Sequence, residues 1–150
     1  MMIKNKGIGL LELMLALAII SVLLVAATRY FSSTNSSQKV NAAANILQAV
    51  INASEDYKMS HNDKYTDISL SNIASLLPSD FSTTSGNPWG GGVDVNPKDG
   101  DNSTIVLTLS GIAPAVDCTA LIDLMSKKGI VSGACADDSG KKKYTGNYSS

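Results

Sequence analysis

The sequence has few of the residue types that build catalytic and metal sites. Its 150 residues include one histidine, His61, and two cysteines, Cys118 and Cys135. A zinc site needs more ligands than these three side chains supply, and His61 is far from both cysteines in sequence. No nucleophile motif or paired carboxylates stand out, and the glycine-rich stretch 90–92 lacks the Lys-Ser/Thr pair of a phosphate loop. We therefore expect no enzyme activity, metal, cofactor or small-molecule substrate.

The chain also has little net charge and few aromatic residues. Its formal net charge is −1, and aromatic side chains make up 5% of the residues. Proteins that bind single-stranded nucleic acid combine basic grooves with stacked aromatic rings, which this composition does not supply. The three lysines at 141–143 are more typical of a solvated surface than of a binding site. The sequence thus leaves any receptor or DNA partner unknown.

Proline is absent between Ile8 and Leu77, and charge is nearly absent from the start of that stretch. From Ile8 to Thr28 the one ionisable side chain is Glu12. About 20 helical residues cover a bilayer core of roughly 30 Å, so this segment is long enough to span a membrane. A charge at that depth costs roughly 2.5–3.5 kcal/mol, which indicates a functional role for Glu12.

The helical pattern continues beyond the apolar segment, where it becomes one-sided. From Val40 to Tyr57 the apolar residues recur at the i, i+3, i+4, i+7 spacing of an amphipathic helix. We therefore expect one helix from Ile8 to about Met59. Its first half is apolar on all sides, and its second half lies with one face against a globular head.

The residues Gly7, Ile8 and Glu12 carry a resemblance to a known family. A short basic leader ends in Gly7, an apolar helix follows, and Glu12 is the fifth residue after that glycine. This arrangement is similar to the precursors of type IV pilins and pseudopilins. The resemblance implies that a prepilin peptidase cuts between Gly7 and Ile8, with possible N-methylation of Ile8. It also implies that Glu12 aligns subunits in a filament by pairing with the new amine of a neighbouring copy.

Two other interpretations of the N-terminus stay open, a secretory signal peptide and a plain uncleaved anchor. The segment Met1–Lys6 is basic, and Val25–Ala27 offers small residues for signal cleavage. Against a signal peptide, the apolar run exceeds the usual 7–15 or so residues and contains an acid. A periplasmic binding protein with such a signal would lose the whole helix and would be indifferent to Glu12.

Beyond residue 60 the pattern predicts a small mixed head. Ser69–Leu77 has apolar residues at helical spacing, with Ser69 or Ser71 as a candidate cap. The runs Val93–Val95 and Thr104–Ser110 flank an Asp-Gly turn and predict an antiparallel hairpin.

Other parts of the head are predicted more loosely. We expect Trp89 to pack on the sheet from a loop, a helix to begin at Cys118, and the tail 141–148 to form an edge strand or a frayed end. Four polar side chains invite comparison with a calcium loop, but the glycine is displaced and no glutamate closes the pattern. These are Asp94, Asn96, Asp99 and Asp101.

The two cysteines are expected to form a disulfide. An exported chain lies in an oxidising compartment, and a loop of this length would gain on the order of 3 kcal/mol from the crosslink. The resemblance agrees, because pilins commonly hold their C-terminal region with one disulfide. Cys118 and Cys135 match that habit.

Together these features predict an α+β protein with a long N-terminal helix, transmembrane in its first half, on a small antiparallel sheet. The expected parts are a leader (1–7), a membrane and filament-core helix half (8–28), an amphipathic half (29–59) and a head (60–150). The resemblance implies a subunit that is held in the bacterial inner membrane and then assembled with its own copies into an extracellular pilus by the assembly machinery. A type IVb or conjugative pilin is favoured over a minor pilin or a type II secretion pseudopilin.

Overall fold

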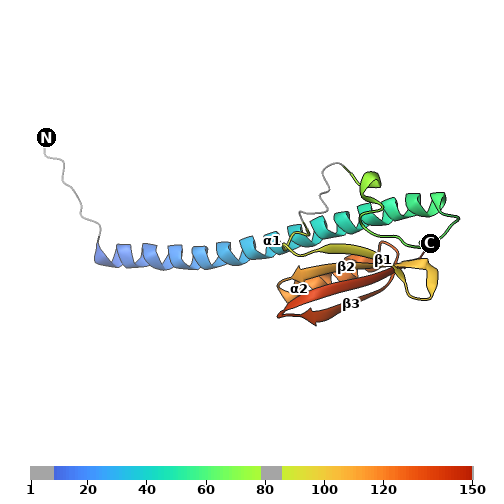
Figure 1. The fold of residues 1–150 in the computed structure, drawn as a ribbon. Helices are drawn as coiled ribbons and strands as arrows, with labels where there is room; N and C mark the ends of the chain where they lie inside the picture. Colours follow the sequence, from blue (N-terminus) through green and yellow to red (C-terminus); the bar gives the residue numbers. More distant parts are fainter. Residues whose placement is uncertain (1–8, 79–85, 150) are drawn as a thin grey trace. The chain divides into compact units, whose positions relative to one another are not determined.

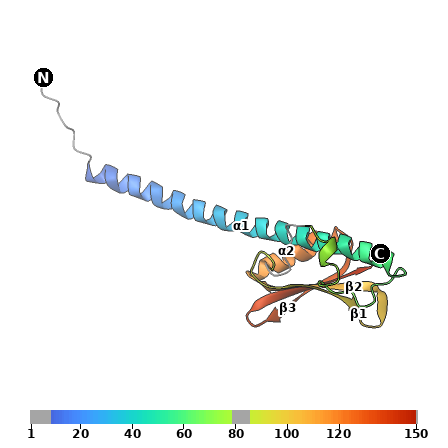
Figure 2. The same ribbon diagram turned by 45° about the horizontal axis from the view of Figure 1, so that its top comes forward.

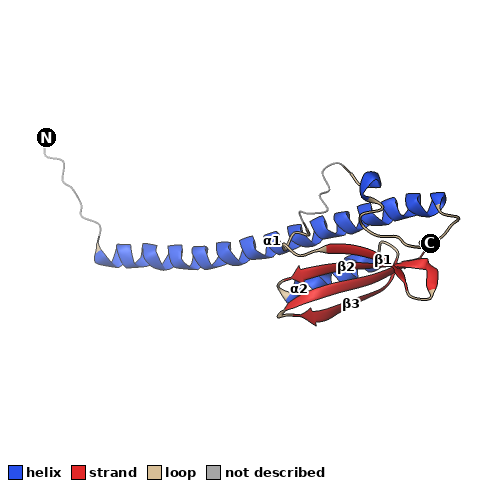
Figure 3. Cartoon of the chain, viewed as in Figure 1, coloured by secondary structure: helices blue, strands red, loops and turns tan. Residues whose placement is uncertain are grey.

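The computed structural model describes residues 9–78 and 86–149. Along the chain these residues form α1 (Leu10–Ser60), a short 3₁₀ helix η1 (Ala74–Leu76), β1 (Val93–Lys98), β2 (Asp101–Ile112), α2 (Ala115–Ser126), β3 (Ile130–Asp138) and β4 (Lys141–Ser149). The class is α+β, as predicted (Figure 3). The chain divides into two compact units, residues 1–36 and 37–150, and α1 contributes to both. The domain limits given above remain predictions.

The helix α1 extends over 51 residues because nothing in its sequence interrupts it. It contains no proline or glycine, and alanine and leucine are frequent in it. Its end follows from the next residues, since Asn62 and Asp63 both adopt positive φ angles of 56°. The predicted helix from Ile8 to about Met59 is confirmed over its described part.

In the second unit, α1 packs with one face on an antiparallel sheet. The strand order is β1-β2-β4-β3 (Figure 1). The residues that α1 buries are the ones that the amphipathic pattern indicates, namely Val40, Ala43, Ala44, Leu47, Val50, Ile51, Ala53, Ser54 and Tyr57. They join one hydrophobic core with residues of the sheet and of α2.

The sheet is apolar on one face. On β2 the buried residues Ile105, Leu107 and Leu109 alternate with half-buried Val106 and Thr108, which is the pattern of a strand with one face on a core. The register places β1 and β4 on either side of β2 with the same alternation. Both α1 and α2 cover the apolar face (Figures 1 and 2).

The predicted hairpin is confirmed, with β1 and β2 joined at Asp99-Gly100. The helix expected from Cys118 begins three residues earlier, at Ala115, directly after Pro114. Proline favours the start of a helix because its missing N–H would have no partner there.

The short helix predicted over Ser69–Leu77 is present only in part, as η1, and the predicted serine cap is wrong. The structure has a turn at Ser69 and a three-residue 3₁₀ helix without a side-chain cap. The Ser69 hydroxyl lies 2.9 Å from the Ser71 hydroxyl, so neither serine caps a helix. Leu77 is extended before Pro78, as residues before proline tend to be, and the few residues left cannot sustain an α-helix.

The prediction that the tail is an edge strand or a frayed end is also wrong. The tail forms β4, which lies between β2 and β3. The reason is Tyr144, whose side chain is fully buried and anchors the strand in the core. A side chain at Gly146 would collide with the Tyr144 ring, so glycine is required at that position.

Candidate functional site

The candidate site begins with the apolar surface of α1 in the first unit. Every described residue from Gly9 to Asn35 is exposed. Large apolar side chains such as Leu10, Leu11 and Val22 are 76%, 81% and 70% exposed. A soluble monomer rarely leaves so large a continuous apolar surface open, so this surface is one that a membrane or other copies of the helix can cover. Among the described residues, α1 is the helix that is long and apolar enough to cross a membrane.

The other polar side chains of this segment satisfy their hydrogen bonds within the helix. The Ser21 hydroxyl donates to the Leu17 carbonyl (2.7 Å), and the Thr28 hydroxyl donates to the Val25 carbonyl (3.0 Å). Backbone carbonyls one turn away are the usual partners of hydroxyl groups in membrane helices. These two side chains can therefore enter lipid at low cost.

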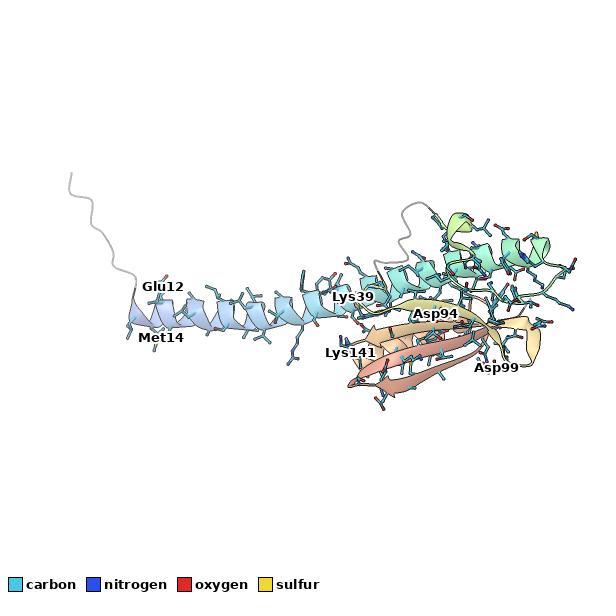
Figure 4. The ribbon with its side chains drawn as sticks, in the orientation of Figure 1. Glu12, Met14, Lys39, Asp94, Asp99 and Lys141 are labelled. Atoms are coloured by element: carbon cyan, nitrogen blue, oxygen red, sulfur yellow. A yellow bond between two sulfur atoms is a disulfide. The ribbon has the colours of Figure 1, made fainter. Side chains whose placement is uncertain are left out.

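Glu12 differs from them. It lies in the first turn of α1 (Figure 4), close to where the Leu13 N–H donates to the Gly9 carbonyl. Within residues 9–78 and 86–149 its carboxylate has no hydrogen bond or ion pair. A helix N-terminus favours negative charge by roughly 0.3–1 kcal/mol, which offsets part of the cost of burial but not all of it. A cation that pairs with the Glu12 carboxylate must therefore come from outside the described residues.

The predicted processing residues Gly7 and Ile8 lie outside the described residues. Their roles, and the role of Glu12 in assembly, remain predictions.

In the head, the structure forms the disulfide. Cys118 in the first turn of α2 is bonded to Cys135 on β3, and their Cα atoms are 6.2 Å apart. The bond links α2 to β3, the outer strand of the sheet. Few side chains of β3 are buried in the core, so the disulfide adds to its attachment. The expectation that these cysteines pair is confirmed.

A hydrogen-bond network around Asn87 holds the loop before β1, and little in the sequence pattern predicts it. The Asn87 side chain is 4% exposed. Its amide donates to the carbonyls of Gly92 (3.1 Å) and Ser110 (2.7 Å), and its oxygen accepts from the N–H groups of Trp89 (3.0 Å) and Gly91 (3.2 Å). A side chain at Gly91 would collide with the backbone of Ser110, so the glycine permits this close approach. The Asn-Pro pair signals a turn in the sequence, but the distant partner on β2 has no local signal.

Trp89 packs against the core, as expected, and links the loop to α2. Its indole N–H donates to Asp117 Oδ2 at 3.0 Å, and Asp117 is 1% exposed. Burial of a carboxylate requires such donors. The neighbouring residue in α2 is Cys118, so the loop and the disulfide are anchored at the same turn.

A second polar cluster joins α1 to the end of β4. Glu55 accepts a hydrogen bond from the Tyr65 hydroxyl (2.6 Å) and lies near Tyr148. Burial, and then the nearby Glu55 carboxylate, raise the pKa of Tyr148 above its ordinary value. These contacts place the C-terminal strand against the helix.

The acidic residues of the β1–β2 hairpin bind their own backbone and neighbours. Asp94 accepts from the Val95 N–H (2.9 Å) and the Asn96 amide (3.1 Å). Asp101 accepts from the Thr104 hydroxyl (2.6 Å) and the Ser103 N–H (2.9 Å), which lowers the pKa of Asp101, mostly through Thr104. Figure 4 labels Asp94 on β1 and Asp99 near the turn. In the described part of the chain, no group of three or more His, Cys, Asp or Glu side chains is placed to hold a metal ion.

Comparison with known proteins identifies the N-terminal segment. The model of the prokaryotic N-terminal methylation motif matches residues 2–28. This match includes Gly7, Ile8 and Glu12, and it confirms the resemblance of the N-terminus to type IV pilins and pseudopilins. No curated protein and no solved structure matches the chain. The chain therefore carries, at its N-terminus, the methylation motif that is characteristic of type IV pilins and pseudopilins.

Proposed function

We propose that this protein is the precursor of a structural pilus subunit. A prepilin peptidase removes residues 1–7, and the mature chain begins at Ile8 with a methylated amine. The observation that carries this proposal is the coincidence of the methylation motif with the exposed apolar first part of α1, where Glu12 is the one carboxylate between residues 9 and 28. Neither feature is required by the fold of the head, which has its own core.

Before assembly the apolar half of α1 lies in the inner membrane. Lys4 and Lys6 precede it and Arg29 follows it, which weakly favours a cytoplasmic N-terminus and an outward-facing head. In the filament, the same apolar surface packs against its copies in place of lipid. The subunit is structural and catalyses no reaction.

Glu12 gives the assembly step its register. In lipid the carboxylate has no water to hydrate it, and the amine of an incoming Ile8 supplies the missing positive charge. Pairing relieves the cost of two buried charges at once, whereas a subunit in the wrong register leaves both unpaired. The pairing partner is therefore a second copy of the chain.

Substitution of Glu12 tests this step. Glu12→Gln keeps the size of the side chain and removes its charge, and Glu12→Asp keeps the charge. We expect sheared filaments to be lost in the Gln variant and to persist in part in the Asp variant, with equal amounts of each protein in the membrane fraction. Ser21→Ala, which removes a polar group already satisfied within the helix, is the matched control. A Glu12→Ala variant that assembled at the level of the unmodified protein would refute the role.

Two related roles share these features. A minor pilin and a type II secretion pseudopilin would carry the same motif, and the abundance of the protein in purified filaments separates them from a main subunit. We favour a main subunit of the type IVb or conjugative kind, on the Trp89 loop and the late helix α2. Its role in adhesion, DNA uptake, conjugation or motility depends on the head surface. A periplasmic binding protein would instead lose α1 with a signal peptide.

A further inference from the structure

The apolar part of α1 ends at a sharp boundary. In the stretch 13–27 every side chain is apolar except Ser21, and in the stretch 32–37 every side chain is polar. Between these stretches, after Thr28, the helix carries one cation and two aromatic rings. These residues, which we call the belt, are Arg29, Tyr30 and Phe31. The belt thus marks the level at which α1 changes from an apolar to a polar surface.

The belt surrounds the helix rather than lining one face of it. Tyr30 and Phe31 are 77% and 74% exposed, and Arg29 is also exposed. Successive residues of an α-helix point in directions about 100° apart, so three consecutive residues face three sides at nearly one level. A helix that docks in a protein groove instead presents anchors at i, i+3, i+4 and i+7 along one face. The belt therefore fits a planar surface through which the helix passes.

The side chains of the belt have the chemistry that lipid headgroups bind. Among the described residues, the Arg29 guanidinium has no hydrogen bond or ion pair. A guanidinium presents a fork of donors that matches the oxygens of a phosphate group. Tyrosine has an apolar ring with a polar tip, and such rings gather where a membrane meets water. A phospholipid surface supplies the phosphate for Arg29 and the polarity boundary for both rings.

We propose that Arg29, Tyr30 and Phe31 bind the phospholipid headgroups of the outer leaflet and so fix the depth of α1 in the membrane. This inference rests on the membrane insertion of α1 in the proposed function. Glu12 lies 17 residues before Arg29, about 26 Å along the helix axis, and a hydrocarbon core is roughly 30 Å thick. With the belt among the headgroups, Glu12 remains inside the core near its opposite boundary.

Spin labels measure this depth in the full chain, reconstituted in vesicles of an equal mixture of phosphatidylcholine and phosphatidylglycerol. Five single-cysteine variants each carry one label, and the native cysteines are held in their disulfide. Collision with oxygen, which concentrates in lipid, is compared with collision with a water-soluble nickel complex. The variants are Val25→Cys, Arg29→Cys, Tyr30→Cys, Phe31→Cys and Ser33→Cys.

We expect oxygen to dominate at residue 25 and the nickel complex to dominate at residue 33, one turn on either side of Arg29. The three belt positions should report intermediate depths that agree within about 3 Å, because two residues of helix rise by that amount. If one belt position were shielded from both reagents, the belt would lie in a protein groove, and the proposal would be wrong.

The contact with phosphate has its own test, because Arg29 is the single arginine of the chain. Solid-state NMR of protein with ¹³C-labelled arginine, in the same vesicles, measures the distance from the guanidinium carbon to lipid ³¹P. We expect a distance within about 5 Å, as a bidentate contact requires. The matched control combines Arg29→Lys with Lys39→Arg, which keeps the charge and moves the one arginine to the next cationic position of α1. Its signal should show no nearby phosphorus.

The proposal is overturned if the label at residue 25 is in water, if the Arg29 signal shows no nearby phosphorus, or if the control shows the same distance. No filament forms in these vesicles, so the result does not depend on assembly. The belt can fail while Glu12→Gln still abolishes filaments, and the belt can hold while Glu12→Gln has no effect. Failure of this proposal and failure of the filament proposal are therefore distinguishable.

Discussion

Asn87 provides the sharpest test of the head structure, because one buried side chain makes four hydrogen bonds. The substitution Asn87→Asp keeps the shape and replaces the amide by a carboxylate. The two bonds donated to the carbonyls of Gly92 and Ser110 are lost, and a charge then faces those carbonyls. Each buried hydrogen bond is worth about 1 kcal/mol, and an unpaired buried charge adds more. We expect the free energy of unfolding to fall by about 3 kcal/mol.

The assay is urea unfolding of the full chain in detergent. Trp89 is the single tryptophan and lies in the affected loop, so its fluorescence follows this region, while circular dichroism follows the whole head. Asn52→Asp, at an exposed position of α1, should change stability by less than about 0.5 kcal/mol. If the free energy of unfolding of Asn87→Asp differed from that of the unmodified protein by as little as in this control, the network around Asn87 would not hold the loop.

Three further predictions concern the same head. Trp89→Phe removes the donor to the buried Asp117 carboxylate and should lower the free energy of unfolding by about 2 kcal/mol. The same urea titration, followed by circular dichroism, measures this change. An unchanged urea midpoint would contradict the contact. Tyr144 has a buried hydroxyl with no hydrogen-bond partner among the described residues, and burial raises its pKa to about 12. Because the unfolded tyrosine loses its proton near pH 10, the contribution of Tyr144 to stability should be constant below that pH and fall as the pH rises from about 10 to 12. Tyr144→Phe should remove this part of the loss, and an identical pH profile would refute the reasoning. Replacement of Cys118 and Cys135 by serine should cost about 3 kcal/mol, measured as a lower urea midpoint than in the oxidised protein, and equal midpoints would show that the core alone fixes α2 on β3.

The sequence predicts well those parts of the fold in which apolar residues or turn residues form a clear local pattern. The buried face of α1 follows from residues such as Leu47 and Val50, which recur at helical spacing, and the β1–β2 hairpin follows from its Asp-Gly turn. The N-terminal motif is equally local, since Gly7 and Glu12 are five residues apart, and its match to the methylation motif needed no knowledge of the fold.

The parts that the sequence does not predict depend on distant partners. The tail appears polar and terminal, and its central place in the sheet results from burial of Tyr144 and from pairing with β2, which is far away in sequence. The helix predicted over 69–77 is shortened to η1, because Leu77 is extended before Pro78.

The mature N-terminus tests the central claim most directly. The protein would be purified from its native host, both from membranes and from sheared surface filaments, and its intact mass and N-terminal peptide determined by mass spectrometry. The proposed function predicts a chain that begins at Ile8 with a methylated amine and retains the whole of α1. A chain that begins after Ala26 or Ala27, or one that keeps Met1 in every fraction, would contradict it.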